Sequence, residues 1–126
     1  MNVGDAMHPG VITCKPTESL RAVAAILAGH RIHAVVVAQD ANGAPLAVVT
    51  DRDVVLRHSR GELDTVTAGS AANAPAVTVR ADVELRQAAE LMAHYGTSHV
   101  IVTEGSGRRP LGVLSTLDVL AAVAKA

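Results

Sequence analysis

Two short segments of this chain carry a hydroxyl side chain followed three residues later by a carboxylate. Thr50 precedes Asp53 in one segment, and Ser115 precedes Asp118 in the other. Each segment follows an aliphatic run, which predicts a strand leading into a helix, with the hydroxyl at the N-cap and the acid in the first turn. The N–H groups of such a helix end attract a phosphate. The carboxylate, which only accepts hydrogen bonds when ionised, suits a ribose diol.

The same spacing is also that of a structural capping box. In this interpretation the hydroxyl accepts a hydrogen bond from the third helical amide, and the acid stabilises the positive end of the helix dipole. Capping alone explains one such segment, and a hydroxyl residue followed by an acid at this spacing is a pattern of low specificity. The residues by themselves leave both interpretations open.

The two segments belong to a longer internal repeat. Residues 45–55 match residues 110–120 at an offset of 65 residues (110 − 45), without a gap. Two copies of one unit fill almost the whole chain, and we place them at residues 1–62 and 63–126. With only two copies, each unit must bury its apolar face against its twin. The cleft between the copies is then the natural place for a functional site.

Each copy predicts the same order of elements, β-α-β-β-α. The helical stripes have apolar residues at i, i+3, i+4 and i+7, and the strands are β-branched runs that we expect to be buried on both faces. Thr17 and Asp82 are the predicted N-caps of the first helices, and Gly29 and Gly96 their predicted ends. The remaining expected elements are strands at 11–14, 32–37, 46–49, 97–102 and 111–114, a hairpin turn at 40–43, second helices at 51–58 and 116–124, and a linker at 61–64.

The composition favours a cytoplasmic protein with an aliphatic core. Apolar residues make up 49% of the 126, and Tyr95 is the only Phe, Trp or Tyr, so no aromatic platform exists for stacking single-stranded nucleic acid. The net charge of −1 provides no basic surface for nucleic acid or an anionic membrane. The first residues lack a basic targeting segment, and no apolar run approaches the about 18 residues of a membrane span. We expect no nucleic-acid and no membrane partner.

Cysteine and histidine usage argues against metal or catalytic chemistry. Cys14 is the single cysteine, which excludes an internal disulfide and favours a small buried side chain at a strand position. None of the six histidines has a recognised ligand spacing on one helix, so we predict no metal site, with His8 and His33 the pair left open. Since no Ser-His-Asp or Cys-His arrangement can be placed, we predict no catalytic residue and no enzymatic activity.

The repeated unit resembles a cystathionine-beta-synthase (CBS) domain, and the whole chain resembles a tandem pair of them, a Bateman module. The resemblance is carried by the small-hydrophobic-hydrophobic-[Ser/Thr]-x-x-Asp end of each copy, by residues 5–9 and by residues 31–37. It implies an α/β fold of the α+β type, in which two pseudo-symmetric β-α-β-β-α repeats, each with a three-stranded sheet, pack their sheets together. It also implies two clefts for adenosyl compounds such as AMP, ADP, ATP or S-adenosylmethionine.

The resemblance assigns residues to both clefts. The two acids would hold ribose hydroxyls, the two hydroxyl residues would meet ribose or phosphate, and the backbone of the first strands would line the adenine pockets. His33 and Arg52 would face phosphate, whereas Ser98 and Leu117 stand at their positions in the second copy, so we expect unequal clefts. The implied nucleotide-binding residues are Ile12, Thr13, His33, Thr50, Arg52 and Asp53 in the first copy, and Val77, Thr78, Ser98, Ser115 and Asp118 in the second.

Three functions remain open at this point. The first is a regulatory ligand-sensing module that binds an adenine nucleotide, needs no resident cofactor and passes its occupancy to an unidentified regulated protein. The second is a structural or oligomerisation module without nucleotide, and the third is a metal-sensing variant. A homodimer is expected, because the apolar residues Leu117, Leu120, Ala121 and Val123 lie on the last helix and need cover.

Overall fold

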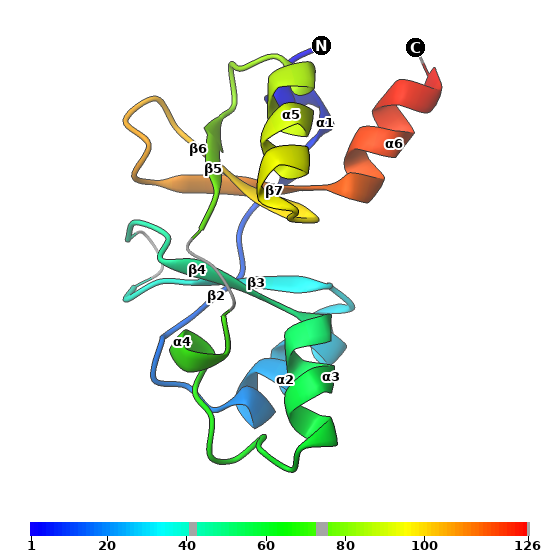
Figure 1. Cartoon of the computed structure of the whole chain (residues 1–126). Coiled ribbons are helices and arrows are strands. Elements are labelled where there is room, and N and C mark those ends of the chain that lie inside the picture. The colour runs from blue at the N-terminus through cyan, green and yellow to red at the C-terminus, as the bar shows by residue number, and fades with distance from the viewer. Residues whose placement is uncertain (41–42, 73–75, 126) are drawn as a thin grey trace. The chain divides into compact units, whose positions relative to one another are not determined.

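The structure is a computed structural model, which describes residues 1–40, 43–72 and 76–125. Its contacts divide the chain into two compact units (Figure 1). The first-repeat unit comprises Ile12–Pro75, and the second-repeat unit comprises Met1–Val11 together with Ala76–Ala126. Each unit has its own sheet, helices and hydrophobic core, which confirms the predicted α/β class.

The sheet of the first-repeat unit consists of β2 (Thr13–Cys14), β3 (Ala34–Val37) and β4 (Ala47–Thr50), in the order β2-β3-β4. β2 runs parallel to β3, and β4 runs antiparallel to it. The helices α2 (Leu20–His30) and α3 (Asp51–Ser59) lie side by side against this sheet (Figure 1). The short helix α4 (Ala68–Ala71) contacts both of them.

The second-repeat unit repeats this plan with one additional strand. Its sheet has the order β1-β7-β6-β5 and is built from β1 (His8–Pro9), β5 (Thr78–Arg80), β6 (His99–Thr103) and β7 (Pro110–Ser115). The helices are α1 (Val3–Ala6), α5 (Leu85–Tyr95) and α6 (Thr116–Lys125), and α1 contacts both α5 and α6. The predicted β-α-β-β-α order is confirmed in both repeats. Among residues 12–40, 43–72 and 76–125, the expected three strands are found in each repeat, and β1 adds a fourth to the second-repeat sheet.

The aliphatic stripes predicted from the sequence form the two cores. The stripe residues are buried in both long helices, namely Leu20, Val23 and Leu27 in α2 and Leu85, Ala88 and Met92 in α5. The β-branched run 35–37 of β3 is fully buried, as is 100–102 of β6, which confirms strands buried on both faces. Removal of these side chains from water is the main favourable term in folding each unit.

The sequence analysis did not predict the two short helices α1 and α4. Each lies in the segment that precedes the first strand of its repeat, here called the leading segment, and connects that segment to one of the cores. Val3 of α1 donates its backbone N–H to Val83 O at 2.8 Å, and Ala68 of α4 donates its own to Glu18 O at 2.8 Å. The two contacts are related by the repeat offset of 65 residues (68 − 3 and 83 − 18). The segment that leads each repeat therefore packs in the unit built from the body of the other repeat. The predicted boundary at 62 and 63 follows the sequence repeat, and the contact units divide the chain differently.

The predicted starts of the first helices were wrong. The N-cap of α2 is Ser19, whose Oγ accepts a hydrogen bond from Ala22 N at 3.2 Å, and Thr17 lies in the preceding turn. Likewise the N-cap of α5 is Glu84, and Asp82 lies two residues before it. In both repeats a turn follows the strand, and the first helical amide donates to a remote segment, Leu20 N to Val66 O at 3.1 Å and Leu85 N to Met1 O at 3.0 Å.

One of the two predicted helix ends is confirmed. Gly96 is the C-cap of α5 and has a left-handed backbone, with φ of 61°. Gly29 lies inside α2, which ends at His30 with Arg31 as its left-handed C-cap, at a φ of 53°. The predicted hairpin turn at 40–43 includes positions 41 and 42, which lie outside the described residues.

Strand β1 depends on a glycine in its neighbour. β1 pairs antiparallel with β7, with Pro9 opposite Gly112. A Cβ atom added at Gly112 would lie 2.2 Å from the backbone oxygen of His8, a distance that no side chain tolerates. The absence of a side chain at this position therefore permits the leading segment to join the sheet.

We expect Gly112→Ala to lower the free energy of unfolding by about 1–3 kcal/mol, because β1 must move away from β7 or the sheet must distort. Urea denaturation measures this change. Gly105→Ala is the matched control, because its added Cβ would meet nothing within 4 Å, and it should leave stability nearly unchanged. Equal stability of the two variants would contradict the close packing of β1.

Candidate functional site

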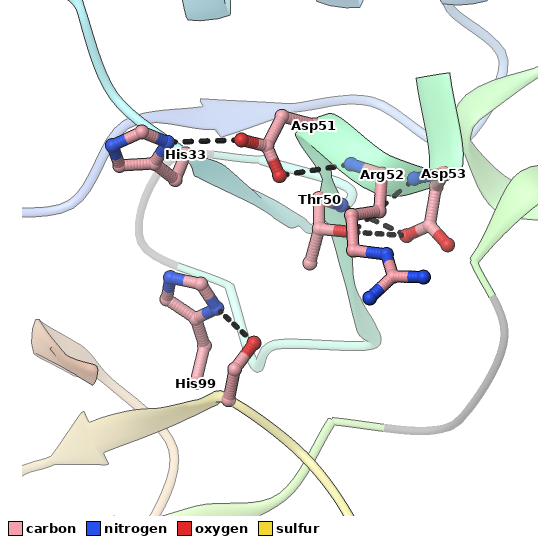
Figure 2. Close-up of polar contacts among 7 residues, drawn as sticks. His33, Thr50, Asp51, Arg52, Asp53 and His99 are labelled. Carbon is pink, nitrogen blue, oxygen red and sulfur yellow. Dashed lines mark hydrogen bonds and ion pairs between the residues drawn. The ribbon is translucent and has the colours of Figure 1, made fainter. Parts of the chain in front are cut away.

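The first strand-to-helix junction lies where β4 ends and α3 begins. Thr50 is the N-cap of α3, and its Oγ1 accepts a hydrogen bond from Asp53 N at 3.3 Å. In return, Thr50 N donates to Asp53 Oδ2 at 2.8 Å. The Asp53 residue is only 8% exposed. A reciprocal capping box therefore holds this carboxylate at the end of the sheet (Figure 2).

The second junction, between β7 and α6, has the same geometry. Ser115 N donates to Asp118 Oδ2 at 2.8 Å, and Asp118 N donates to Ser115 Oγ at 3.2 Å. Asp118 is buried to the same extent as Asp53. The capping interpretation is thus confirmed at both junctions. The cap leaves acceptor positions open on each carboxylate, because an ionised carboxylate has about four of them.

Charged side chains surround the first junction. His33 Nδ1 lies 2.9 Å from Asp51 Oδ2, and Asp51 Oδ1 accepts the backbone N–H of Arg52 at 2.8 Å (Figure 2). His33 and Arg52 are both exposed, so the entrance to this junction carries one titratable and one permanently cationic group. The second repeat places Ser98 and Leu117 at the corresponding positions. Ser98 Oγ lies 3.0 Å from the ring Nδ1 of His99.

A histidine that the sequence analysis did not assign to the site contacts the second junction. His8, in β1, places its Nδ1 2.8 Å from Asp118 Oδ1. The sequence offered little signal for this contact, because His8 and Asp118 belong to different copies of the repeat. The leading segment brings them together by joining the second-repeat unit.

In the first-repeat unit, the predicted site residues gather at one end of the sheet. Val36 N donates to Ile12 O at 3.1 Å, and Asp51 N donates to His33 O at 2.9 Å. The parallel strands β2 and β3 both begin at this end, and the antiparallel β4 finishes there at Thr50. The strand directions alone therefore place backbone and side-chain polar groups side by side.

The second-repeat unit has the equivalent arrangement. Ile101 N donates to Val77 O at 2.9 Å, and Thr116 N donates to Ser98 O at 3.0 Å. Ser115 closes β7 at the same end. Val77, Ser98 and Ser115 thus lie at one end of this sheet, as their counterparts do in the first-repeat unit.

The two threonines that open the first strands have different surroundings. Thr13 is half-buried and pairs with Val36. Thr78 is exposed and pairs with Ile101, and it contributes to a groove along α5 that neither Ser115 nor Asp118 lines. The groove residues are Thr78, Val79, Arg80, Val83, Gln87, Glu90, Leu91, His94, Thr103 and Gly107.

The buried thiol is not part of a reactive site. Cys14 is 4% exposed in the first-repeat core, as expected for a small apolar side chain. Burial, together with the nearby negative charge of Glu18, raises the pKa of the Cys14 thiol to about 11. Within residues 1–40, 43–72 and 76–125, no three His, Cys, Asp or Glu side chains gather in a way that could hold a metal ion. No helix in those ranges is long and apolar enough to cross a membrane.

A comparison with models of known families finds the CBS domain twice, at residues 3–59 and 68–125. Two matches agree with the presence of two equivalent junctions. The chain belongs to the CBS domain family. The two matches begin 65 residues apart (68 − 3), which is the offset of the internal repeat. They cover both capping-box junctions and both leading helices.

Two similar solved structures have nearly the same length as this chain. The chain is 27% identical to the CBS domain protein PAE2072 from Pyrobaculum aerophilum complexed with AMP, with a TM-score of 0.84 and all of both chains covered. It is 25% identical to Hypoxic Response Protein I with two coordinated zinc ions, with a TM-score of 0.79 and coverage of 96% of this chain and 98% of that one.

A longer relative is the uncharacterized protein MK0525 of Methanopyrus kandleri. The two are 30% identical over 122 residues, which is 95% of this chain. The chain spans 61% of the length of this curated relative.

We expect Cys14 to resist a thiol reagent at pH 8, because a thiol with a pKa near 11 holds almost no thiolate there and its sulfur is buried. Reaction with an aromatic disulfide reagent, followed by absorbance, measures the rate. The same protein in denaturing urea should react at the rate of a small free thiol. Rapid reaction of the folded protein would contradict the buried position.

Proposed function

We propose that the protein is a regulatory module that binds an adenine nucleotide at its two strand-to-helix junctions and transmits occupancy to a separate regulated protein. The observation that carries this proposal is that both strand-to-helix junctions have the same capping-box geometry. Both junctions present a hydroxyl, the amides of a helix N-terminus and a carboxylate that is 8% exposed. The likeness to the CBS domain protein PAE2072 complexed with AMP supports the adenosyl ligand.

The chemistry of each junction suits one part of the ligand. The buried carboxylate of Asp53 or Asp118 accepts hydrogen bonds from the two ribose hydroxyls, and its charge makes these bonds stronger than neutral ones. The hydroxyl of Thr50 or Ser115 and the helix N-terminus favour the negative charge of a phosphate. Backbone groups at the start of β2 and β5 provide the polar edge that adenine needs.

The two junctions differ in charge, so we expect them to differ in phosphate preference. The first has the exposed cation of Arg52 in the first turn of α3, with His33 beside it. The second has the imidazole of His8 but no cation in the first turn of α6, where Leu117 stands at the position of Arg52. A ligand with several phosphates therefore gains more at the first junction than at the second.

The main alternative is a structural module whose junctions are caps only. The complete capping boxes favour this alternative, because each acid already has a structural role. A zinc-sensing function is the third candidate, and the likeness to a protein with two coordinated zinc ions supports it. Titration with AMP, ATP and zinc separates the three.

We also propose a homodimer that uses α6. Leu117, Leu120 and Val123 are 69%, 63% and 62% exposed, and they follow one another at three-residue steps along this helix. On α3 of the other unit, Val55 is 66% exposed. Burial of such side chains against a second copy stabilises an isologous dimer.

Asp53→Asn and Asp118→Asn should each weaken nucleotide binding at least tenfold at their own junction, because each loses charge-assisted hydrogen bonds to ribose worth about 1.5–3 kcal/mol. Calorimetric titration with AMP and ATP measures the affinity. Wild type with a hundredfold excess of ligand over its dissociation constant should gain about 2.7 kcal/mol of stability, and the double variant should gain none.

The matched control for these variants is Asp5→Asn. Asp5 is the acid of the capping box in α1, where its Oδ2 accepts Asn2 N at 3.1 Å, and it belongs to neither junction. It should lose only a few tenths to about 1 kcal/mol of stability. If both junction variants behaved like this control and kept full affinity, the nucleotide sites would be excluded.

Leu120→Glu should convert the dimer to a monomer, since it places a charge where the proposed interface excludes water. Sedimentation equilibrium at micromolar concentrations distinguishes the two states. Val55→Glu tests α3 in the same way, and Lys125→Glu at the end of α6 controls for charge alone. A monomeric wild type under these conditions would rule out the dimer.

A further inference from the structure

Both carboxylate oxygens of Asp118 already have donors. Ser115 N donates to Oδ2 at 2.8 Å, and His8 Nδ1 lies 2.8 Å from Oδ1. The Asp118 side chain is only 7% exposed, whereas that of His8 is 79% exposed. Each oxygen therefore has one of its two acceptor positions taken, and the position that His8 occupies on Oδ1 is one that a ribose diol could use.

The backbone of His8 is held in the sheet, while its ring lies at the surface. β1 pairs with β7, Gly10 N donates to Leu111 O at 2.8 Å, and Val3 of the preceding helix is fully buried. The side chain can therefore change rotamer without any movement of the strand that carries it. This arrangement places a mobile donor on a fixed support beside Asp118.

We propose that His8 is an internal competitor for the ribose hydroxyls at Asp118. The ring N–H donates to Oδ1, one of the oxygens that a ribose diol would use, so adenosine binds the second-repeat junction more tightly when the His8 side chain turns away. Both the imidazolium and the neutral tautomer with a proton on Nδ1 can make this contact. The inference rests on the proposed nucleotide function and adds a self-inhibitory contact to it.

The histidine of the first junction, His33, corresponds to Ser98 and not to His8, whose equivalent, position 73, lies outside the described residues. There His33 pairs with Asp51, the first residue of α3, instead of Asp53 at the third position. The corresponding first helical residue of α6 is Thr116, which is not ionisable. The contact between His8 and Asp118 thus depends on the path of the leading segment.

The test measures AMP affinity at the second junction alone, in an Asp53→Asn background that weakens the first. Adding His8→Ala should raise AMP affinity about threefold, because an exposed ion pair of this kind is worth up to about a fivefold change in binding. His8→Gln retains a side-chain N–H donor and should restore part of the inhibition. His58→Ala removes an exposed imidazole in the last turn of α3, whereas Asp53 lies in the first turn of that helix, and should leave affinity unchanged.

A second measurement follows the ring directly in the otherwise wild-type protein. The NMR signals of the His8 imidazole should shift as AMP saturates the second junction, because the ring leaves the carboxylate. Unchanged or reduced affinity in His8→Ala, or unshifted His8 signals in the AMP complex, would overturn the competitor role while leaving nucleotide binding intact. Absence of AMP and ATP binding in every variant, wild type included, would instead refute the proposed function and the inference together.

Discussion

The backbone hydrogen bonds that hold each leading segment in the unit of the other repeat are the constraint on which the rest of the structure depends. Val3 donates to Val83 O, and Ala68 donates to Glu18 O, both at 2.8 Å. Without these segments each sheet-and-helix body is only about 50 residues long, a size at which burial of apolar surface is marginal. Because each copy contributes a segment to its twin, neither copy completes its core from its own residues.

The exchange of leading segments between the two units also affects residues that do not take part in these hydrogen bonds. It carries β1 to the edge of β7, where Gly112 permits the backbones to meet. It also brings His8 against Asp118, which no contact within a single copy could do. In the second-repeat unit it thus adds a strand to the sheet and a histidine to the junction, while the equivalent positions of the other copy, 73 and 74, lie outside the described residues.

Under the proposed function, one carboxylate at each junction has both a structural and a binding role. The hydrogen bonds between Thr50 and Asp53 hold α3 at the end of β4, and those between Ser115 and Asp118 hold α6 at the end of β7. An acid that is positioned by a cap has little freedom to lose when a ligand binds, so its hydrogen bonds to ribose cost less entropy. The same preorganisation makes the acid a good acceptor for a neighbouring side chain such as His8.

The sequence by itself determined the repeat, the β-α-β-β-α order, the buried stripes and the capping boxes, because these depend on spacing along one segment. The helix starts at Thr17 and Asp82 were predicted wrongly, since the turn after each first strand depends on how the chain reaches the sheet. α1 and α4 were missed for a related reason, as four-residue helices have almost no periodicity of their own. Only the tertiary structure decided which copy each leading segment joins, and hence that His8 meets Asp118, because pairing between remote backbone groups leaves no local pattern in the sequence.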